Sequence, residues 1–146
     1  MNILVSACLV GTCCRYDGRH GYNEVIASLS KIHTLIPICP EQLGGFPTPR
    51  PAAELKDGRV VTKSGNDITS QFDLGAKETL KIAQLTNCTF AILKNRSPSC
   101  GITQIYDGHF SGKRVDGMGI TANFLQQNGM TVISENDTQT LELLGK

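Results

Sequence analysis

The sequence lacks the features of a membrane-spanning, secreted or strongly charged protein. No apolar stretch in its 146 residues approaches the ~18–20 residues that a membrane-spanning helix needs. The first residues, MNILVSACLVG, have no basic segment, and their apolar run contains Ser6 and continues into polar sequence, so we expect no signal peptide. Fourteen basic and thirteen acidic side chains give a net charge of +1. Bulk charge therefore gives no reason to expect nucleic-acid binding and leaves only a local basic patch open. We expect a cytoplasmic protein that does not bind a membrane.

The motifs of several common binding sites are also missing. A GxGxxG fingerprint should follow the first strand, but the chain has LVGTCCRYDG there. GHFSGK (108–113) is one residue short of a P-loop, and Arg114 follows it in place of Ser or Thr. The three histidines show no metal-ligand spacing, and no CxxC pair occurs. Zinc-ribbon and thioredoxin-like sites therefore lose their main support.

What is present is the composition and periodicity of an α/β protein. A hydrophobic content of 40% and a charged content of 18% are typical of globular chains, and the length favours one domain over residues 1–146. Apolar runs predict strands, helical spacing predicts helices, and Asp57-Gly58 predicts a β-hairpin. The expected strands are 3–7, 34–38, 89–93 and 131–134, the helices 22–32, 69–86, 119–128 and 138–144, and the hairpin 54–62. Pro37 suits an edge strand, and Thr69 or Ser70 is expected to cap the second helix. We expect residues 39–51 to form a loop and Asp107-Gly108 to form a second turn within 104–112. This alternation predicts an α/β fold with a mainly parallel sheet of about four strands plus a β-hairpin insertion.

Three of the six cysteines lie just beyond predicted strands. Cys8 follows the first strand, Cys39 the second, and Cys100 lies on a loop after the third. The residues around Cys39 and Cys100 are typical of exposed loops. In open parallel sheets, sites form beyond the carboxyl ends of the strands, so these three thiols can converge if the strands are neighbours. Thiolates are soft ligands that suit zinc, copper(I) or iron–sulfur clusters, and the residues alone leave this choice open. A set of three leaves one position open, which favours catalysis over a structural site.

The other cysteines are expected to have lesser roles. Cys13 and Cys14 are adjacent, and neighbouring residues seldom reach one metal, so we interpret them as accessory or incidental thiols. Cys88 precedes the third strand and therefore lies at the opposite end of the sheet from the proposed site. We expect it to be a core cysteine.

Three stretches together resemble the thiouracil-desulfurase family. They are SACLVGTCCRYDG (6–18), CPEQLGGFPTPRP (39–51) and LKNRSPSCG (93–101). They occur in the family's order, and the chain length fits its short single-domain form. The resemblance thus spans nearly the whole chain, and it implies a Rossmann-like domain that holds a [4Fe-4S] cluster as its cofactor.

The resemblance also implies an activity and a set of site residues. A small thionated pyrimidine base or nucleoside, such as 2-thiouracil, would bind through its sulfur to the open iron and be converted to its oxo form with release of sulfide and no net redox change. Glu41 would activate water, and Ser97 would donate to the substrate or relay a proton. The cluster ligands would be Cys8, Cys39 and Cys100, and further candidates for contacts with the base are Arg15, Asp17, Lys94 and Asn95.

Two other functions remain open at this point. The same chemistry could act on thiouridine in tRNA, although relatives with that role carry an added RNA-binding domain and the net charge here is near zero. The three thiols could also form a non-catalytic metal-binding or redox-sensing module, or a zinc-bound structural site. A non-catalytic module predicts that Glu41→Ala leaves function intact, whereas a desulfidase loses its activity.

Overall fold

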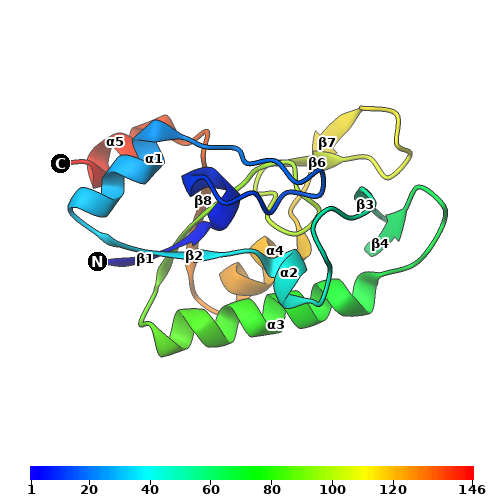
Figure 1. The fold of residues 1–146 in the computed structure, drawn as a ribbon, viewed down its shortest axis with the longest axis horizontal. Helices are drawn as coiled ribbons and strands as arrows, with labels where there is room; N and C mark the ends of the chain where they lie inside the picture. Colours follow the sequence, from blue (N-terminus) through cyan, green and yellow to red (C-terminus); the bar gives the residue numbers. More distant parts are fainter.

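Four parallel strands form the central sheet of the computed structural model, which describes residues 1–146 (Figure 1). Their order is β2-β1-β5-β8. The strands are β1 (Asn2–Ser6), β2 (Thr34–Ile38), β5 (Phe90–Leu93) and β8 (Thr131–Ser134). The predicted α/β fold with a parallel four-stranded sheet is therefore confirmed, and Pro37 lies in an edge strand, as expected from its missing N–H.

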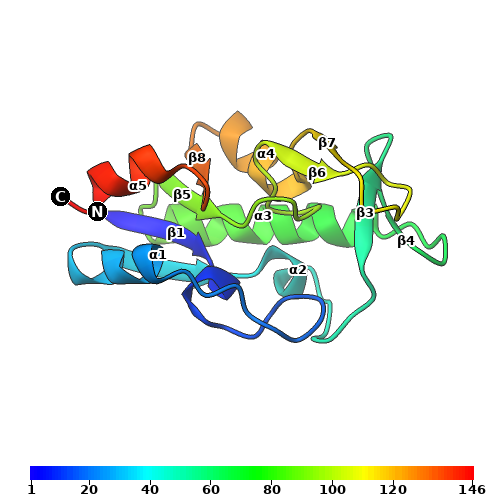
Figure 2. The ribbon, with the colours of Figure 1, turned by 90° about the horizontal axis from the view of Figure 1, so that it is seen from above.

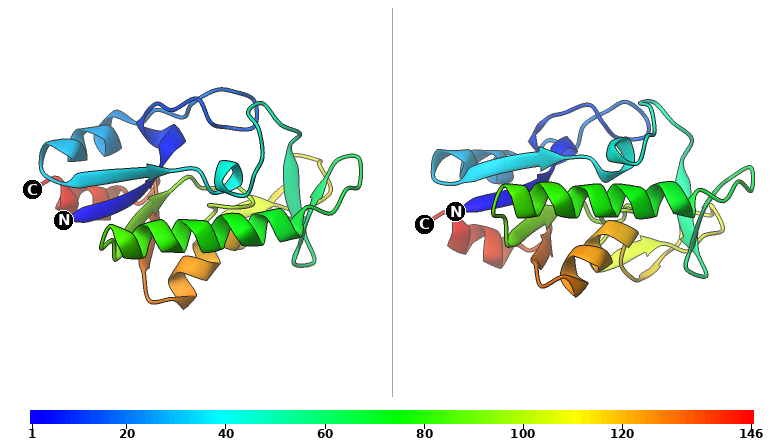
Figure 3. Two further views of the ribbon diagram at one scale, coloured as in Figure 1. Left: turned by 60° about the horizontal axis from the view of Figure 1, so that its bottom comes forward. Right: turned by 90° about the horizontal axis from the view of Figure 1, so that it is seen from below.

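Helices cover both faces of this sheet, and alternate strand residues point to opposite faces. Ile3 and Val5 pack with residues of α1 and α5, whereas Leu4 packs with residues of α3 and α4. Figures 1 and 2 show α1 and α5 on one side of the sheet, and Figure 3 shows α3 and α4 together on the other. The helices are α1 (Glu24–Ser28), α2 (Pro40–Leu43), α3 (Thr69–Leu85), α4 (Ile120–Gln127) and α5 (Thr138–Leu144), with 3-10 turns η1 (Ala7–Val10) and η2 (Leu29–Lys31). None of them is long and apolar enough to cross a bilayer.

Two antiparallel hairpins complete the fold. β3 (Ala53–Lys56) and β4 (Arg59–Thr62) form the predicted hairpin around Asp57-Gly58, where both residues have positive φ as a tight turn requires. The second hairpin pairs β6 (Gln104–Tyr106) with β7 (Arg114–Asp116). Sequence reasoning predicted only a turn there, because strands of three residues are too short to show alternation.

The prediction that residues 39–51 form a loop throughout is wrong, because they include the short helix α2. Pro40 is its first residue, a position that proline favours because its missing N–H would be unpaired there anyway. The helix packs against α3 backbone to backbone. A Cβ on Gly75 would lie 2.1 Å from the carbonyl oxygen of Pro40, and one on Gly44 would lie 2.3 Å from that of Gln71. These two glycines therefore set how closely α2, and the residues it carries, approaches the rest of the molecule.

Candidate active site

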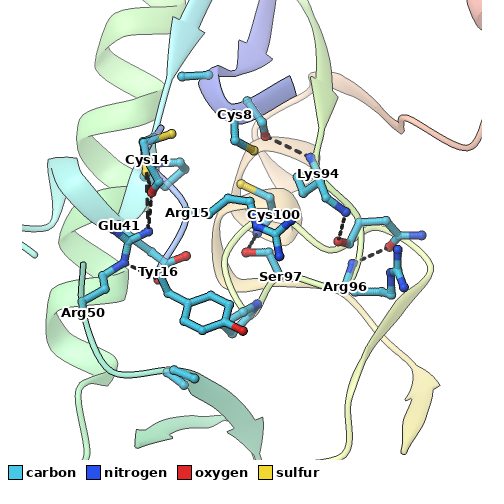
Figure 4. Close-up of a pocket in the computed structure, with 18 of the residues that line it drawn as sticks. Cys8, Cys14, Arg15, Tyr16, Glu41, Arg50, Lys94, Arg96, Ser97 and Cys100 are labelled. Atoms are coloured by element: carbon cyan, nitrogen blue, oxygen red, sulfur yellow. Dashed lines mark hydrogen bonds and ion pairs between the residues drawn. The ribbon is translucent and has the colours of Figure 1, made fainter. Parts of the chain in front are cut away.

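A cavity of about 350 Å³ opens at the carboxyl ends of β1, β2 and β5 (Figure 4). All three predicted cysteine ligands line it, as do both predicted catalytic residues, Glu41 and Ser97. Of the four further candidates, Asp17 does not line the cavity; those that do are Arg15, Lys94 and Asn95. The structure thus brings together residues that are far apart in the sequence.

The strand order explains this convergence. β1 lies between β2 and β5, so the segments that follow these three strands meet at one edge of the sheet. Cys8 lies in η1 directly after β1, and Cys39 lies between β2 and α2. In Figure 4 the sulfur atoms of Cys8 and Cys100 point toward one another. The condition set by the sequence, that the three strands be neighbours, is therefore met.

Cys14 is a fourth thiol at the cavity, which the sequence reasoning did not place there. It is 2% exposed, and interactions with the thiols of Cys39 and Cys8 shift its pKa. Its carbonyl accepts a hydrogen bond from the Cys39 thiol at 3.7 Å. Cys13 is exposed, and Cys88 is buried against α3 and α4 away from the cavity. Adjacency therefore misleads for Cys14, because only one of the two neighbours faces the cavity: Cys14 is buried there and Cys13 is exposed.

Three of the cavity thiols have raised pKa values. A hydrogen bond with Cys14, together with burial, raises the pKa of Cys39. The Cys14 pKa is lowered by its hydrogen bond to Cys39 but raised more strongly by the bond to Cys8 and by burial, to about 11. Burial is the main cause that raises the pKa of Cys100, to about 12. These thiols are therefore protonated at neutral pH unless a bound cation stabilises the thiolates.

The arrangement of the donors bears on what they can hold. No group of three or more His, Cys, Asp or Glu side chains lies close enough to bind one metal ion. A tetrahedral zinc site, which needs such a group, is therefore not formed by these side chains. Soft sulfur donors spread along the wall of a single cavity suit a larger group with several metal atoms.

Glu41 lies in the first turn of α2 and is paired with a buried arginine. Its Oε1 accepts a hydrogen bond from Nε of Arg50 at 3.2 Å, and its side chain is 17% exposed against 3% for Arg50. Burial raises the pKa of the Glu41 carboxyl, and the charge and hydrogen bond of Arg50 counteract this only in part. The arginine binds one carboxylate oxygen, and no protein group donates to Oε2.

The loop that carries Cys100 is buried, which corrects the expectation of an exposed loop. Cys100 is 5% exposed, because the loop packs on the start of α4. The amides of Ile120 and Thr121 donate to the carbonyls of Pro98 and Ser99, and a Cβ on Gly119 would lie 2.4 Å from the Ser99 carbonyl oxygen. A glycine before α4 thus allows the helix to hold this loop against the sheet.

Ser97 and Asn95 shape this loop in different ways. The Ser97 hydroxyl oxygen accepts from the amides of Ser99 and Cys100, both at 3.1 Å, which leaves its proton free to donate. Asn95 is 3% exposed, and its side chain forms hydrogen bonds within the loop. Its oxygen accepts from four backbone amides, and its NH₂ group donates to the Thr103 hydroxyl. Asn95 thus acts on the shape of the loop, whereas Ser97 faces the cavity.

The charged side chains at the cavity differ in how they are paired. Lys94 forms an ion pair with Glu135 at 2.9 Å, and the other oxygen of Glu135 accepts from the Asn95 amide. Arg15 lies 3.9 Å from Asp17, a weak contact between partly exposed groups. Lys94 is therefore held in place by its partner, while Arg15 retains freedom to meet a ligand.

Sequence reasoning missed Arg50 as a member of this site. It lies within CPEQLGGFPTPRP, one of the three stretches on which the resemblance was based. An arginine between two prolines on a predicted surface loop gives no signal of burial. Only the structure shows that Arg50 is buried beside Glu41, with 3% of its side chain exposed.

A family model described as 2-thiouracil desulfurase matches residues 3–137. This chain belongs to the 2-thiouracil desulfurase family. The matched range contains the cavity cysteines, Glu41 and Ser97. The family resemblance predicted from the three motifs is therefore confirmed.

Two further relatives of this 2-thiouracil desulfurase family member match along nearly its whole length. The uncharacterized protein YbbK of Bacillus subtilis (strain 168) is 46% identical over 145 residues, which cover 92% of this chain and 96% of YbbK. The solved structure of the [4Fe-4S]-dependent thiouracil desulfidase TudS has a TM-score of 0.91 and 42% identity, and the match covers 97% of this chain and 95% of TudS. The fold is thus shared with a protein whose name states its cofactor and its activity.

Proposed function

We propose that this protein is a desulfidase that converts a thionated pyrimidine such as 2-thiouracil to its oxo form with release of sulfide. One observation carries the proposal: Cys8, Cys39 and Cys100, from three separate segments, line one cavity together with Glu41 and Ser97. Family membership and the likeness to TudS support the same reading. The cavity volume of about 350 Å³ is within the range of small-molecule sites, roughly 300–1,000 Å³.

We propose that the three thiols of Cys8, Cys39 and Cys100 hold a [4Fe-4S] cluster. The chemistry of the donors fits this group, because they are soft, come from separate elements and form no site for a single ion. When bound, the cluster supplies an iron with an open coordination position, which acts as a Lewis acid toward a sulfur atom. Because the pKa values of the Cys39 and Cys100 thiols are raised, these two ligands lose their protons as the metal binds.

Glu41 is the proposed general base. Arg50 holds Oε1, so Oε2 can accept a proton from a water molecule in the cavity. The water oxygen forms a bond to the thiocarbonyl carbon while the carboxylate takes the proton, and the carbon–sulfur bond then breaks. A raised pKa makes this carboxylate a stronger base than an exposed glutamate. Overall, C=S and water give C=O and H₂S, so no electron is gained or lost.

Ser97 is the proposed donor to the substrate. Its oxygen is occupied by two backbone amides, so the hydroxyl hydrogen is directed away from them and can donate to a ring nitrogen or oxygen. Arg15, together with the ion-paired Lys94, adds positive charge at the cavity. These groups would orient a polar heterocycle relative to Glu41, which is the main requirement for a directed attack by water.

The decisive test is sulfide release from 2-thiouracil by protein reconstituted with iron and sulfide under anaerobic conditions. We expect turnover by the wild type and a loss of at least ~100-fold for Glu41→Gln with iron content unchanged, the usual scale for losing a general base. Cys100→Ala should lose both iron and activity. Cys88→Ala is the matched control, because Cys88 is also buried but lies away from the cavity.

The outcomes separate the remaining alternatives. Zinc without iron after anaerobic reconstitution contradicts the cluster, and full activity of Glu41→Gln contradicts the proposed base. Activity on thiolated tRNA but not on 2-thiouracil, with an affinity for tRNA that falls steeply as salt rises, would show that the substrate is RNA.

A further inference from the structure

Arg50 is the most completely buried charged side chain at the cavity, at 3% exposure. An arginine stays protonated in proteins, so its charge is carried into the interior at a considerable desolvation cost. Buried charges persist where specific partners compensate them. The partners of Arg50 therefore indicate what the residue is for.

Each nitrogen of the guanidinium contacts a different part of the site. Nε donates to Oε1 of Glu41 at 3.2 Å. Nη2 donates to the carbonyl oxygen of Cys14 at 2.8 Å and lies 3.9 Å from the sulfur of Cys39. Nη1 donates to the carbonyl of Pro47 at 3.2 Å and to the hydroxyl of Thr48 at 3.0 Å. One planar group thus touches both the proposed base and one of the proposed cluster ligands.

The backbone of Arg50 is fixed as well. Its amide donates to the carbonyl of Tyr16 at 2.9 Å, so two loops that are distant in sequence are joined at this residue. The side chain therefore has little freedom, and its contacts with Glu41 and Cys39 are imposed by the fold. A fixed donor beside a metal ligand orients that ligand and changes the electron density on its sulfur.

We propose that Arg50 is a positioning residue that fixes the Glu41 carboxylate for catalysis and, through its contact with the Cys39 sulfur, tunes the cluster. The inference rests on the proposed function. Hydrogen bonding to a ligand sulfur withdraws electron density and raises the reduction potential of an iron–sulfur cluster. Holding Oε1 leaves Oε2 as the oxygen that faces water. Arginine suits both tasks because its donors are set at fixed angles, whereas a lysine ammonium cannot reach the same partners together.

The test compares Arg50→Lys and Arg50→Gln with a matched control pair, Arg59→Lys and Arg59→Gln. Arg59 also donates through Nε to a carboxylate, that of Asp67 at 2.8 Å, but its side chain is 61% exposed and lies outside the cavity. Thr48→Val is a milder variant, because it keeps the arginine and removes the contact of the Thr48 hydroxyl with Nη1, together with the hydrogen bond that this hydroxyl accepts from Gln42 at 2.8 Å. Folding is checked by circular dichroism, and cluster loading by iron and sulfide content.

The readouts are the reduction potential of the reconstituted cluster and the separate values of kcat and KM for 2-thiouracil. For Arg50→Lys we expect a more negative potential and a kcat at least ~10-fold lower with KM changed less than about threefold, since the lost contacts serve the transition state more than binding. Thr48→Val should move both values in the same direction by less. The Arg59 variants should match the wild type.

The result that overturns the proposal is an Arg50→Lys protein with the wild-type potential and the wild-type kcat. If Arg50→Lys does not fold, a Thr48→Val protein with unchanged potential and kcat also overturns the proposal. A wild type that holds the cluster but releases no sulfide contradicts the proposed function alone, because the potential still reports on Arg50. A wild type that binds no cluster overturns both.

Discussion

At the scale of single residues, the site depends on side chains that are already engaged with the protein. Ser97 accepts from two amides, and Glu41 is bound by Arg50 through one oxygen. Each nevertheless keeps one atom available for the reaction: the hydroxyl proton of Ser97 and one carboxylate oxygen of Glu41. Side chains held in this way need little reorganisation when a substrate arrives, which is the basis of catalysis by a preorganised site.

Ser97 provides the prediction at this scale. Ser97→Ala should lower sulfide release from 2-thiouracil on the order of 10²-fold, since it removes the proposed proton donor. The same change also leaves the amides of Ser99 and Cys100 without their acceptor, so iron content is measured in parallel. Ser97→Thr keeps the hydroxyl and should retain the loop, while Ser111→Ala on an exposed loop serves as control. Full activity in Ser97→Ala would remove Ser97 from the mechanism.

At the scale of elements, the contact between α2 and α3 decides where Cys39 and Glu41 lie. The two helices meet at Gly44 and Gly75, where neither side has room for a methyl group. α2 is short, with no side-chain cap, so its position depends on this contact more than on its own hydrogen bonds. The long helix α3 thus fixes the position of the short helix that carries Glu41.

Gly75→Ala tests that role. The new Cβ would meet the Pro40 carbonyl, so α2 must move, and we expect a loss of about 1–3 kcal/mol in the free energy of unfolding. The activity should fall by more than the loss of stability alone explains, since Glu41 moves with the helix. Chemical denaturation and sulfide release measure the two effects. Gly65→Ala, in a loop with open space around it, is the comparison for steric crowding, although its positive φ adds strain of its own. A Gly75→Ala protein with wild-type stability would show that α2 has room to shift.

Elements were predicted well from sequence where a distinct apolar run or a helical spacing marks them. The strands 34–38 and 131–134 and the helix 138–144 agree with the structure in both bounds. α2 was missed because its four residues lie in a stretch rich in proline and glycine, which predicts a loop. The second hairpin was missed because its strands of three residues are too short to show alternation. For the long helix, Thr69 or Ser70 was expected to be the cap, but Thr69 is its first residue, and Asp67 accepts from the Thr69 amide.

Some of the site residues could likewise be predicted from sequence and others could not. Cys8, Cys39 and Cys100 could be placed at one sheet edge because each follows a strand, and that rule needs only the strand positions. Arg50 and Cys14 could not, because their burial results from contacts between loops, namely the bonds from Arg50 to the carbonyls of Cys14 and Tyr16. Local sequence carries no signal for contacts of that kind.

At the scale of the whole molecule, the core is built independently of the proposed cofactor. Two apolar clusters, one on each face of the sheet, contain the buried residues of β1 and β5 together with those of the covering helices. Cys14 and Cys100 belong to these clusters, and Cys39 packs against one of them. The pKa values of these three thiols are raised, so without metal they are neutral and leave no buried unpaired charge among them.

Removing the metal tests this independence. After anaerobic chelation of iron, we expect the far-ultraviolet circular dichroism to be unchanged and thermal unfolding to remain cooperative. The Tm should be lower than that of the loaded protein, because a group that binds only the folded state stabilises it. Hydrogen exchange of β1 and β5 should remain slow. Loss of a cooperative transition would mean that the cofactor is part of the fold.

The position of β1 in the middle of the sheet has a consequence for how the protein is made. β1 is synthesised first, yet its two neighbours, β2 and β5, appear much later, and β5 begins only at Phe90. A chain emerging from the ribosome carries Cys8, Cys14 and Cys39 long before Cys100 exists to complete the set. Pairings so distant in sequence also form slowly. Assembly of the iron–sulfur group is therefore expected to follow synthesis of at least the first two-thirds of the chain, and thiols exposed in the interval depend on the reducing state of the cell.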